Sequence, residues 1–212
     1  MSQSLDNEKE GQLPSFSEQM CTMFNFDNKQ QWLRDADLTY CAARHLLFAE
    51  NVFFRSPVGY LLHQAVEKYL KTLRKVLSPD IPEKQGSHNL CALHSDVKNQ
   101  KKCLDVPEVK NAISDLNILQ QWRYQDRPLK QTRKAMDDGL TSADLLVARV
   151  RTEIPVEIRF QGLHRILQLS GTHGELLLNA LLANNSQRAH WESDLFGISK
   201  NIDRIIKANR NL

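Results

Sequence analysis

Apolar residues recur at three- and four-residue spacings along most of the chain, and this pattern constrains the fold more than any other feature. In the first such segment, Trp32, Ala36, Tyr40 and Ala43 fall on one face of a helix. The same periodicity predicts helices at about 28–53, 57–77, 88–99, 106–122, 130–152 and 187–209. In the second of these, Ser56 is suited to cap the helix and Pro57 to occupy its first position.

The segment "IPVEIRF" is ambiguous, because its alternation also fits a strand. We favour a helix that begins near Pro155, since no other segment offers a partner strand. The predicted fold is therefore all-α: an antiparallel up-down helical bundle of four to five helices with a C-terminal helical extension. The predicted organisation is a loose N-terminal leader at 1–27, the bundle at 28–153 and the extension at 154–212.

Composition limits the classes of protein to which the chain can belong. With 212 residues, 41% of them hydrophobic, it is long enough to bury a core. The net charge of +3 is too small for a general nucleic-acid coat, so any basic site must be local. We expect a cytoplasmic protein with no membrane segment, and four free thiols, because no long apolar run, export signal or CxxC pair is present.

The stretch "HQAVEKYLK", residues 63–71, concentrates polar groups beside an apolar face. On a helical wheel the side opposite that face carries Gln64, Lys68, Lys71 and Lys75, with His63, Glu67 and Arg74 along its margin. Three interpretations compete: a plain solvated face with a favourable Glu67–Lys71 pair, a binding surface for an anion, or part of a catalytic site.

Four motifs occur in an order that favours the second interpretation. They are "WLRDADL" (32–38), "HQAVEKYLK" (63–71), "HNLCAL" (88–93) and "WRYQDRP" (122–128). Together they resemble the HEPN (higher eukaryotes and prokaryotes nucleotide-binding) domain family over about residues 28–130. The resemblance implies a helical bundle that commonly forms a homodimer and holds nucleotide or RNA in a polar groove, without a cofactor. Related proteins occur beside minimal nucleotidyltransferases in toxin–antitoxin pairs.

By this resemblance, the nucleotide- or phosphate-binding residues come from two motifs. Gln64, Glu67, Lys68 and Lys71 belong to the second motif, and Arg123 and Tyr124 to the fourth. Together with the lysines, Arg123 and Arg127 offer charge-assisted hydrogen-bond donors to phosphate.

Nuclease members of the family use an Arg followed, after four to six residues, by a His. The pair supplies a fixed cation and a proton acceptor. Here Arg123 is followed by "YQDRPLK", which contains no His. The spacing occurs elsewhere in the chain only at Arg159 and His164, outside the region of resemblance, and His63 is the other candidate base. We therefore expect a binding module without conventional ribonuclease activity. The alternatives are a metal-independent ribonuclease toxin, or a helical adaptor that binds partners through a seam at residues 191–205.

A metal site is not expected. The segment "HNLCALH" places His88, Cys91 and His94 at three-residue steps, which drift around a helix and do not converge on one ion. We expect His88 near the helix start, Cys91 in the core and His94 in solvent. No Walker loop, GxGxxG, HExxH or GxSxG motif is present.

Overall fold

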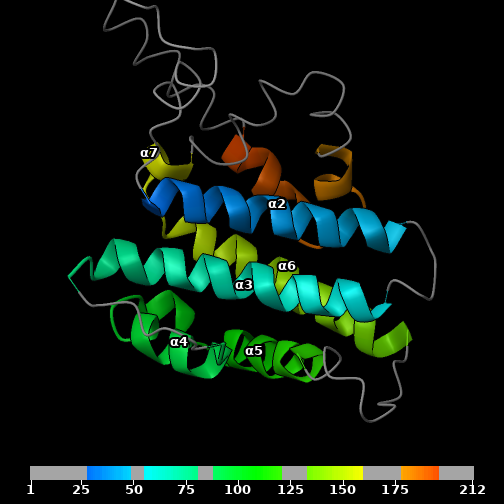
Figure 1. The fold of residues 1–212 in the computed structure, drawn as a ribbon, viewed down its shortest axis with the longest axis horizontal. Coiled ribbons are helices and arrows are strands. Elements are labelled where there is room, and N and C mark those ends of the chain that lie inside the picture. The colour runs from blue at the N-terminus through cyan, green and yellow to red at the C-terminus, as the bar shows by residue number, and fades with distance from the viewer. Residues whose placement is uncertain (1–27, 49–54, 81–87, 121–132, 160–177, 196–212) are drawn as a thin grey trace, which may run out of the picture.

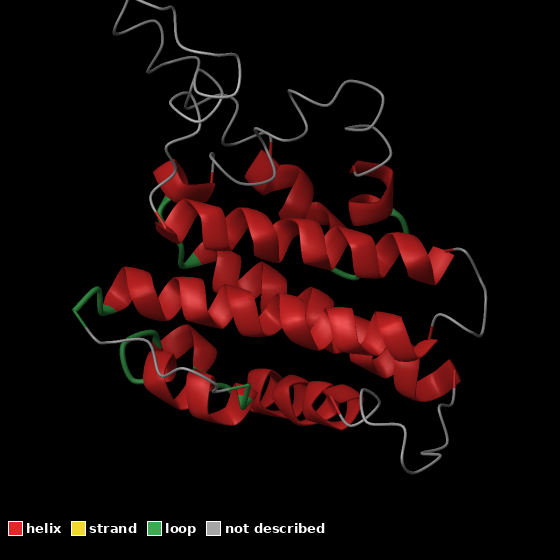
Figure 2. Cartoon of the chain, viewed as in Figure 1, coloured by secondary structure: helices red, strands yellow, loops and turns green. Residues whose placement is uncertain are grey.

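A computed structural model describes five stretches of the chain: 28–48, 55–80, 88–120, 133–159 and 178–195. Within them the chain is all helical, as predicted, and no strand occurs in these ranges (Figure 2). The helices are α2 (Asn28–Phe48), α3 (Arg55–Leu77), α4 (Leu90–Lys98), α5 (Pro107–Gln120), α6 (Arg133–Thr152) and α7 (Val156–Arg159). A short 3-10 helix, η2 (Lys102–Leu104), joins α4 to α5, and residues 178–182 and 188–195 are also helical.

Helix α3 lies at the centre of the bundle. It runs beside α2 in the opposite direction, while α4 and α5 pack on its other flank and α6 crosses behind it (Figure 1). The two helical stretches near the C-terminus lie against α2 on the side away from α3 (Figure 1). Because α2, α4, α5 and α6 all contact α3, little of its circumference is left for water.

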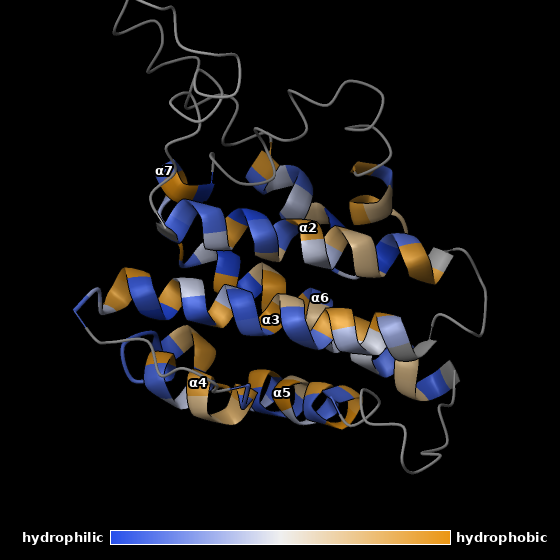
Figure 3. Ribbon diagram, in the orientation of Figure 1, coloured by the Kyte–Doolittle hydropathy of each residue, from blue (hydrophilic) through white to orange (hydrophobic). Residues whose placement is uncertain are grey.

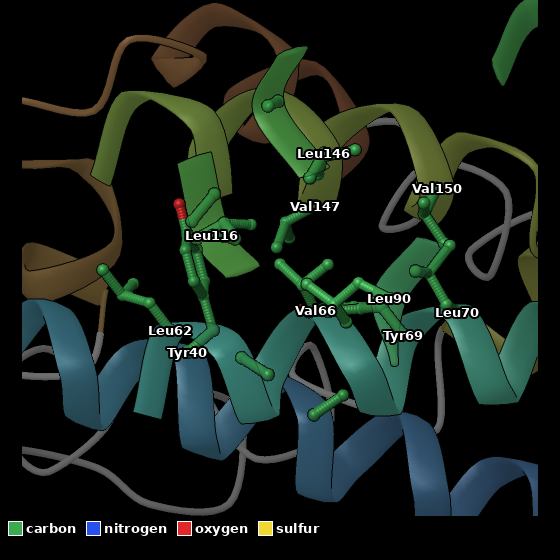
Figure 4. Close-up of a cluster of buried hydrophobic side chains, with 14 of the residues drawn as sticks. Tyr40, Leu62, Val66, Tyr69, Leu70, Leu90, Leu116, Leu146, Val147 and Val150 are labelled. Carbon is green, nitrogen blue, oxygen red and sulfur yellow. The ribbon is translucent and has the colours of Figure 1, made fainter. Parts of the chain in front are cut away.

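The core follows the apolar stripes that the sequence predicted. Along α3, the side chains of Leu62, Ala65, Val66, Tyr69 and Leu73 are fully buried. They meet residues of α4, α5 and α6, including Leu90, Leu116, Leu146, Val147 and Val150 (Figure 4). Coloured by hydropathy, α3 shows polar positions interrupting this apolar surface along its length (Figure 3).

In α5 the adjacent apolar residues Ile118 and Leu119 cannot both face the core, and packing decides between them. Leu119 is 1% exposed and Ile118 is 48% exposed, so Leu119 is the core residue. Gly139 of α6 explains how closely the two helices approach there, because a Cβ at that position would lie 2.5 Å from Leu119 Cδ1.

Two helix starts differ from the sequence prediction. Helix α3 begins at Arg55, so Pro57 lies within its first turn and not at its first position; a missing amide is tolerated there because the first four N–H groups have no helical acceptor. Helix α4 is capped by Asn89, whose side chain accepts a hydrogen bond from the Ala92 N–H at 3.2 Å. The helical interpretation of "IPVEIRF" is confirmed for Val156–Arg159.

Candidate functional site

The polar residues of "HQAVEKYLK" form a narrow edge on α3, between α2 and α4. We call Gln64, Glu67, Lys68 and Lys71 the α3 edge. A plain solvated face, one of the three interpretations, does not describe this part of α3, because neighbouring helices cover most of it. Glu67 is only 6% exposed, while Gln64, Lys68 and Lys71 are partly exposed.

Glu67 is the centre of the edge on the side of α4. Its Oε1 forms an ion pair with Lys71 Nζ at 2.9 Å. The Nδ1 atom of His88, just before α4, lies 3.1 Å from both carboxylate oxygens. One buried carboxylate is thus shared by an ammonium group and an imidazole, and the side chain of His88 is 55% exposed beyond it.

The other two residues of the edge face different neighbours. Lys68 Nζ donates to the hydroxyl of Thr39 on α2 at 3.0 Å. Gln64 Nε2 lies 2.5 Å from the hydroxyl of Tyr60, one turn earlier on α3. The lysines at 68 and 71 therefore have different partners, Thr39 on α2 for Lys68 and Glu67 on α3 for Lys71. Lys68 is held by a neutral hydroxyl group, whereas the charge of Lys71 is balanced by Glu67.

His63, a candidate base, lies one turn before Glu67 and is 1% exposed. Its Nε2 atom has no hydrogen-bond partner among the described residues. Burial lowers the pKa of His63 to about 4, although Glu67 acts in the opposite direction. The imidazole is consequently neutral at neutral pH, but water does not reach it.

The remaining candidates divide between residues held in ion pairs and residues beyond the described stretches. Arg159 of α7 donates to Asp194, in the C-terminal helical stretch. Its predicted partner His164 lies outside the described residues, as do Arg123, Tyr124 and Arg127. The predicted contribution of the fourth motif to the site therefore stays a prediction.

The "HNLCALH" segment corrects two expectations. Cys91 is exposed, not in the core, and His94 is 5% exposed, not in solvent. The reason is the buried stripe of α4, which consists of Leu90, Leu93, His94 and Val97 and leaves Cys91 on the outer face. His94 Nε2 lies 2.7 Å from the carbonyl oxygen of Leu104, whereas His88 bonds Glu67, so the two imidazoles serve different contacts.

Sequence reasoning missed a set of buried ion pairs. We call Arg44, Asp144, Arg151, Asp37 and Asp194 the ionic clamp. Arg44 of α2 donates through Nη1 to Asp144 of α6 at 2.5 Å. It also donates to the carbonyl oxygens of Ala180 and Ala183, at 2.9 and 2.5 Å, and so ties the end of the helical stretch 178–182 to the bundle.

The second half of the clamp is centred on Arg151 of α6. It donates to Asp37 of α2, and to Asp194 at 2.8 Å, and its guanidinium carbon lies 4.8 Å from the ring centroid of Trp191. Burial alone favours the neutral form of Arg151, but the Asp37 carboxylate and its neighbours outweigh it and raise the pKa above its usual value. Arg151 therefore stays charged in the interior.

One sequence signal points to the clamp. In "SADLLVARV" and "LTYCAARHLL", Asp144 follows the core residue Ala143, and Arg44 follows the core residue Ala43; Arg149 follows Ala148 in the same way but is exposed. Opposite charges inside apolar stripes of two helices predict a buried pair once the helices are known to touch.

Comparisons with protein-family models, with curated proteins and with solved structures each find no match to this chain. None of the helices in the described ranges combines the length and the hydropathy that a membrane span needs.

Proposed function

We propose that the chain is a HEPN-type module that binds nucleotide or RNA through the α3 edge, without the conventional Arg–His pair of ribonucleases. The observation that carries the proposal is the α3 edge itself: a row of polar groups, two of them lysines, on the central helix of an all-α bundle. The order of the four sequence motifs supports it, because the second and third motifs meet at Glu67 and His88.

The chemistry of the edge suits phosphate. Lys68 donates to a neutral hydroxyl group, and Lys71 pairs with one carboxylate, so each ammonium group retains further N–H groups to donate. Phosphate oxygens are strong acceptors for such charge-assisted hydrogen bonds. Arg123, Tyr124 and Arg127 belong to the proposed site by the family resemblance alone.

The biological setting is part of the same proposal. The resemblance suggests a homodimer that works with a nucleotidyltransferase-type protein in a toxin–antitoxin or related defence system. The ribonuclease alternative has no specific support from the described residues: His63 is buried, and Arg159 is held by Asp194.

Charge reversal of both lysines tests the proposal. Lys68→Glu/Lys71→Glu should weaken binding of a short RNA by tenfold or more, and should reduce the slope of log affinity against log salt by about 0.7 for each phosphate that is no longer neutralised. Fluorescence anisotropy at several salt concentrations measures both quantities. Lys134→Glu is the matched control, because this lysine is 83% exposed on α6 and pairs with Asp138 on its own helix.

Circular dichroism should show the same helical content in all three proteins. Unchanged RNA affinity in a folded double variant would contradict the proposal. The milder Lys68→Gln/Lys71→Gln replaces the double reversal if the latter does not fold.

A further inference from the structure

We propose that the α3 edge is a pH-gated oxyanion site, in which protonation of His88 releases Lys71 from Glu67 to bind phosphate. This inference rests on the proposed function and adds its regulation. It starts from one geometric fact: Lys71 and His88 share a single carboxylate.

The distances show how closely the carboxylate is shared. Lys71 Nζ lies 2.9 Å from Glu67 Oε1, and His88 Nδ1 lies 3.1 Å from the same oxygen. Because both nitrogens contact one atom, they are at most about 6 Å apart, close enough for one phosphate group to reach both side chains. Glu67 is largely buried and cannot turn away to a solvent-exposed position without breaking both interactions.

The net charge of Glu67, Lys71 and His88 depends on whether His88 is protonated. With His88 neutral, Lys71 and Glu67 balance each other and the three groups carry no net charge. With His88 protonated, the imidazolium is a second cation for the same carboxylate and the group carries one net positive charge. The described titratable groups that face His88 are Glu67, Lys71 and His63, all on α3. His63 does not supply the response above pH 5, because its pKa is about 4.

The solvent-exposed part of the site consists mainly of the side chains of His88 and Lys71. The side chain of His88 is 55% exposed and that of Lys71 is 17% exposed, whereas that of Glu67 is 8% exposed. An incoming phosphate therefore meets N–H donors, while the carboxylate lies beneath them. The ligand class is an oxyanion that keeps its charge between pH 8 and 5.5, such as the phosphodiester groups of RNA.

The experiment measures affinity for an oligouridylate with a pH-insensitive fluorescent label at pH 5.5 and pH 8, at constant ionic strength. Phosphodiesters do not titrate in this range, so a change of affinity reports on the protein. We expect wild type to bind about fivefold more tightly at pH 5.5, the size of one exposed ionic interaction. His88→Gln should abolish most of this gain.

Glu67→Gln keeps the shape of the side chain and removes its charge. It should bind about fivefold more tightly than wild type at pH 8, because Lys71 no longer has a competing carboxylate. His45→Gln is the matched control for protonation in general, since His45 is exposed on α2, and it should keep the wild-type pH response.

A His88→Gln protein with the full wild-type pH response would overturn the inference while leaving the proposed function intact. So would a folded Glu67→Gln protein that binds RNA more weakly at pH 8. Absence of RNA binding by wild type at both pH values would overturn both proposals.

Discussion

The ionic clamp and the α3 edge are both built from charged side chains, but water reaches only one of them. In the clamp, the side chains of Arg44, Asp144, Arg151, Asp37 and Asp194 are at most 2% exposed. At the edge, Lys71 and His88 are 17% and 55% exposed around their buried carboxylate. Ion pairs of the same chemical kind are therefore shielded from water in the clamp and partly exposed to it at the edge.

Exposure to water decides what each region can do. A buried pair holds its geometry, because separating the charges leaves one of them unsolvated in the interior. At the edge the two cations reach water although their carboxylate does not, so a cation that leaves Glu67 is solvated and partners exchange more readily than in the clamp. We infer that the clamp fixes residues 178–195 on the bundle, and that the edge is free to respond to a ligand.

Breaking the clamp should have the largest effect. Arg151→Met removes the buried cation shared by two buried carboxylates, Asp37 and Asp194, and should lower the free energy of unfolding by about 3–5 kcal/mol. Urea denaturation at pH 7 measures this decrease. Arg188→Met is the control, because Arg188 pairs with Glu192 on the same C-terminal stretch while 61% exposed, and it should change stability by under about 0.5 kcal/mol. Equal decreases in the two variants would remove the distinction between buried and exposed pairs.

The second largest effect on stability should come from the titration of His63. Its pKa is about 4 in the folded protein and 6.5 when unperturbed, so the unfolded chain takes up the proton first as the pH falls. The stability associated with the neutral imidazole is present above pH 6.5 and is lost between pH 6.5 and 4, by about 3 kcal/mol.

His63→Leu should remove this contribution, because leucine does not titrate. Urea denaturation at pH 7, 5.5 and 4.5 should show a smaller decline in the variant than in wild type. An identical decline in both proteins would show that the folded state takes up the proton as easily as the unfolded chain, and that His63 is more accessible than its position indicates.

The smallest effect on stability should come from a substitution at the α3 edge, which should mainly change RNA binding. Lys71→Met should cost about 1–2 kcal/mol: more than the loss of an exposed pair, because Glu67 is largely buried, but less than Arg151→Met, because His88 still contacts Glu67. The same change should reduce the salt slope of RNA binding by about 0.7. Lys110→Met on α5 serves as control, because Lys110 pairs with Asp105 and both side chains are about half exposed. A decrease in stability as large as that of Arg151→Met would mean that the edge is structural.

The helices were largely predictable, since their positions depend on local spacing. The stripe in α3 from Leu62 to Leu73 is buried as its periodicity predicts. Where two neighbours were both plausible, as for Ile118 and Leu119, the spacing alone did not decide. The error over Cys91 and His94 has the same origin: residue type favoured a buried thiol and a solvated imidazole, but the orientation of α4 placed them the other way.

The candidate site was predictable in part. Its residues on α3 follow from one motif, and the proximity of the third motif to the second is a consequence of α4 packing on α3. The pairing of His88 with Glu67, 21 positions apart, was not predictable from either motif alone.

Residue spacing was sufficient to predict that this protein is helical, where most of its helices lie along the chain, and which face of α3 is buried. Helix packing was needed to establish which charges are buried together, as Arg44 with Asp144 and Arg151 with Asp37, over separations of 100 and 114 positions. The physical reason is that periodicity acts within a few residues of one helix, whereas the environment of a charge is set by the helix that packs over it.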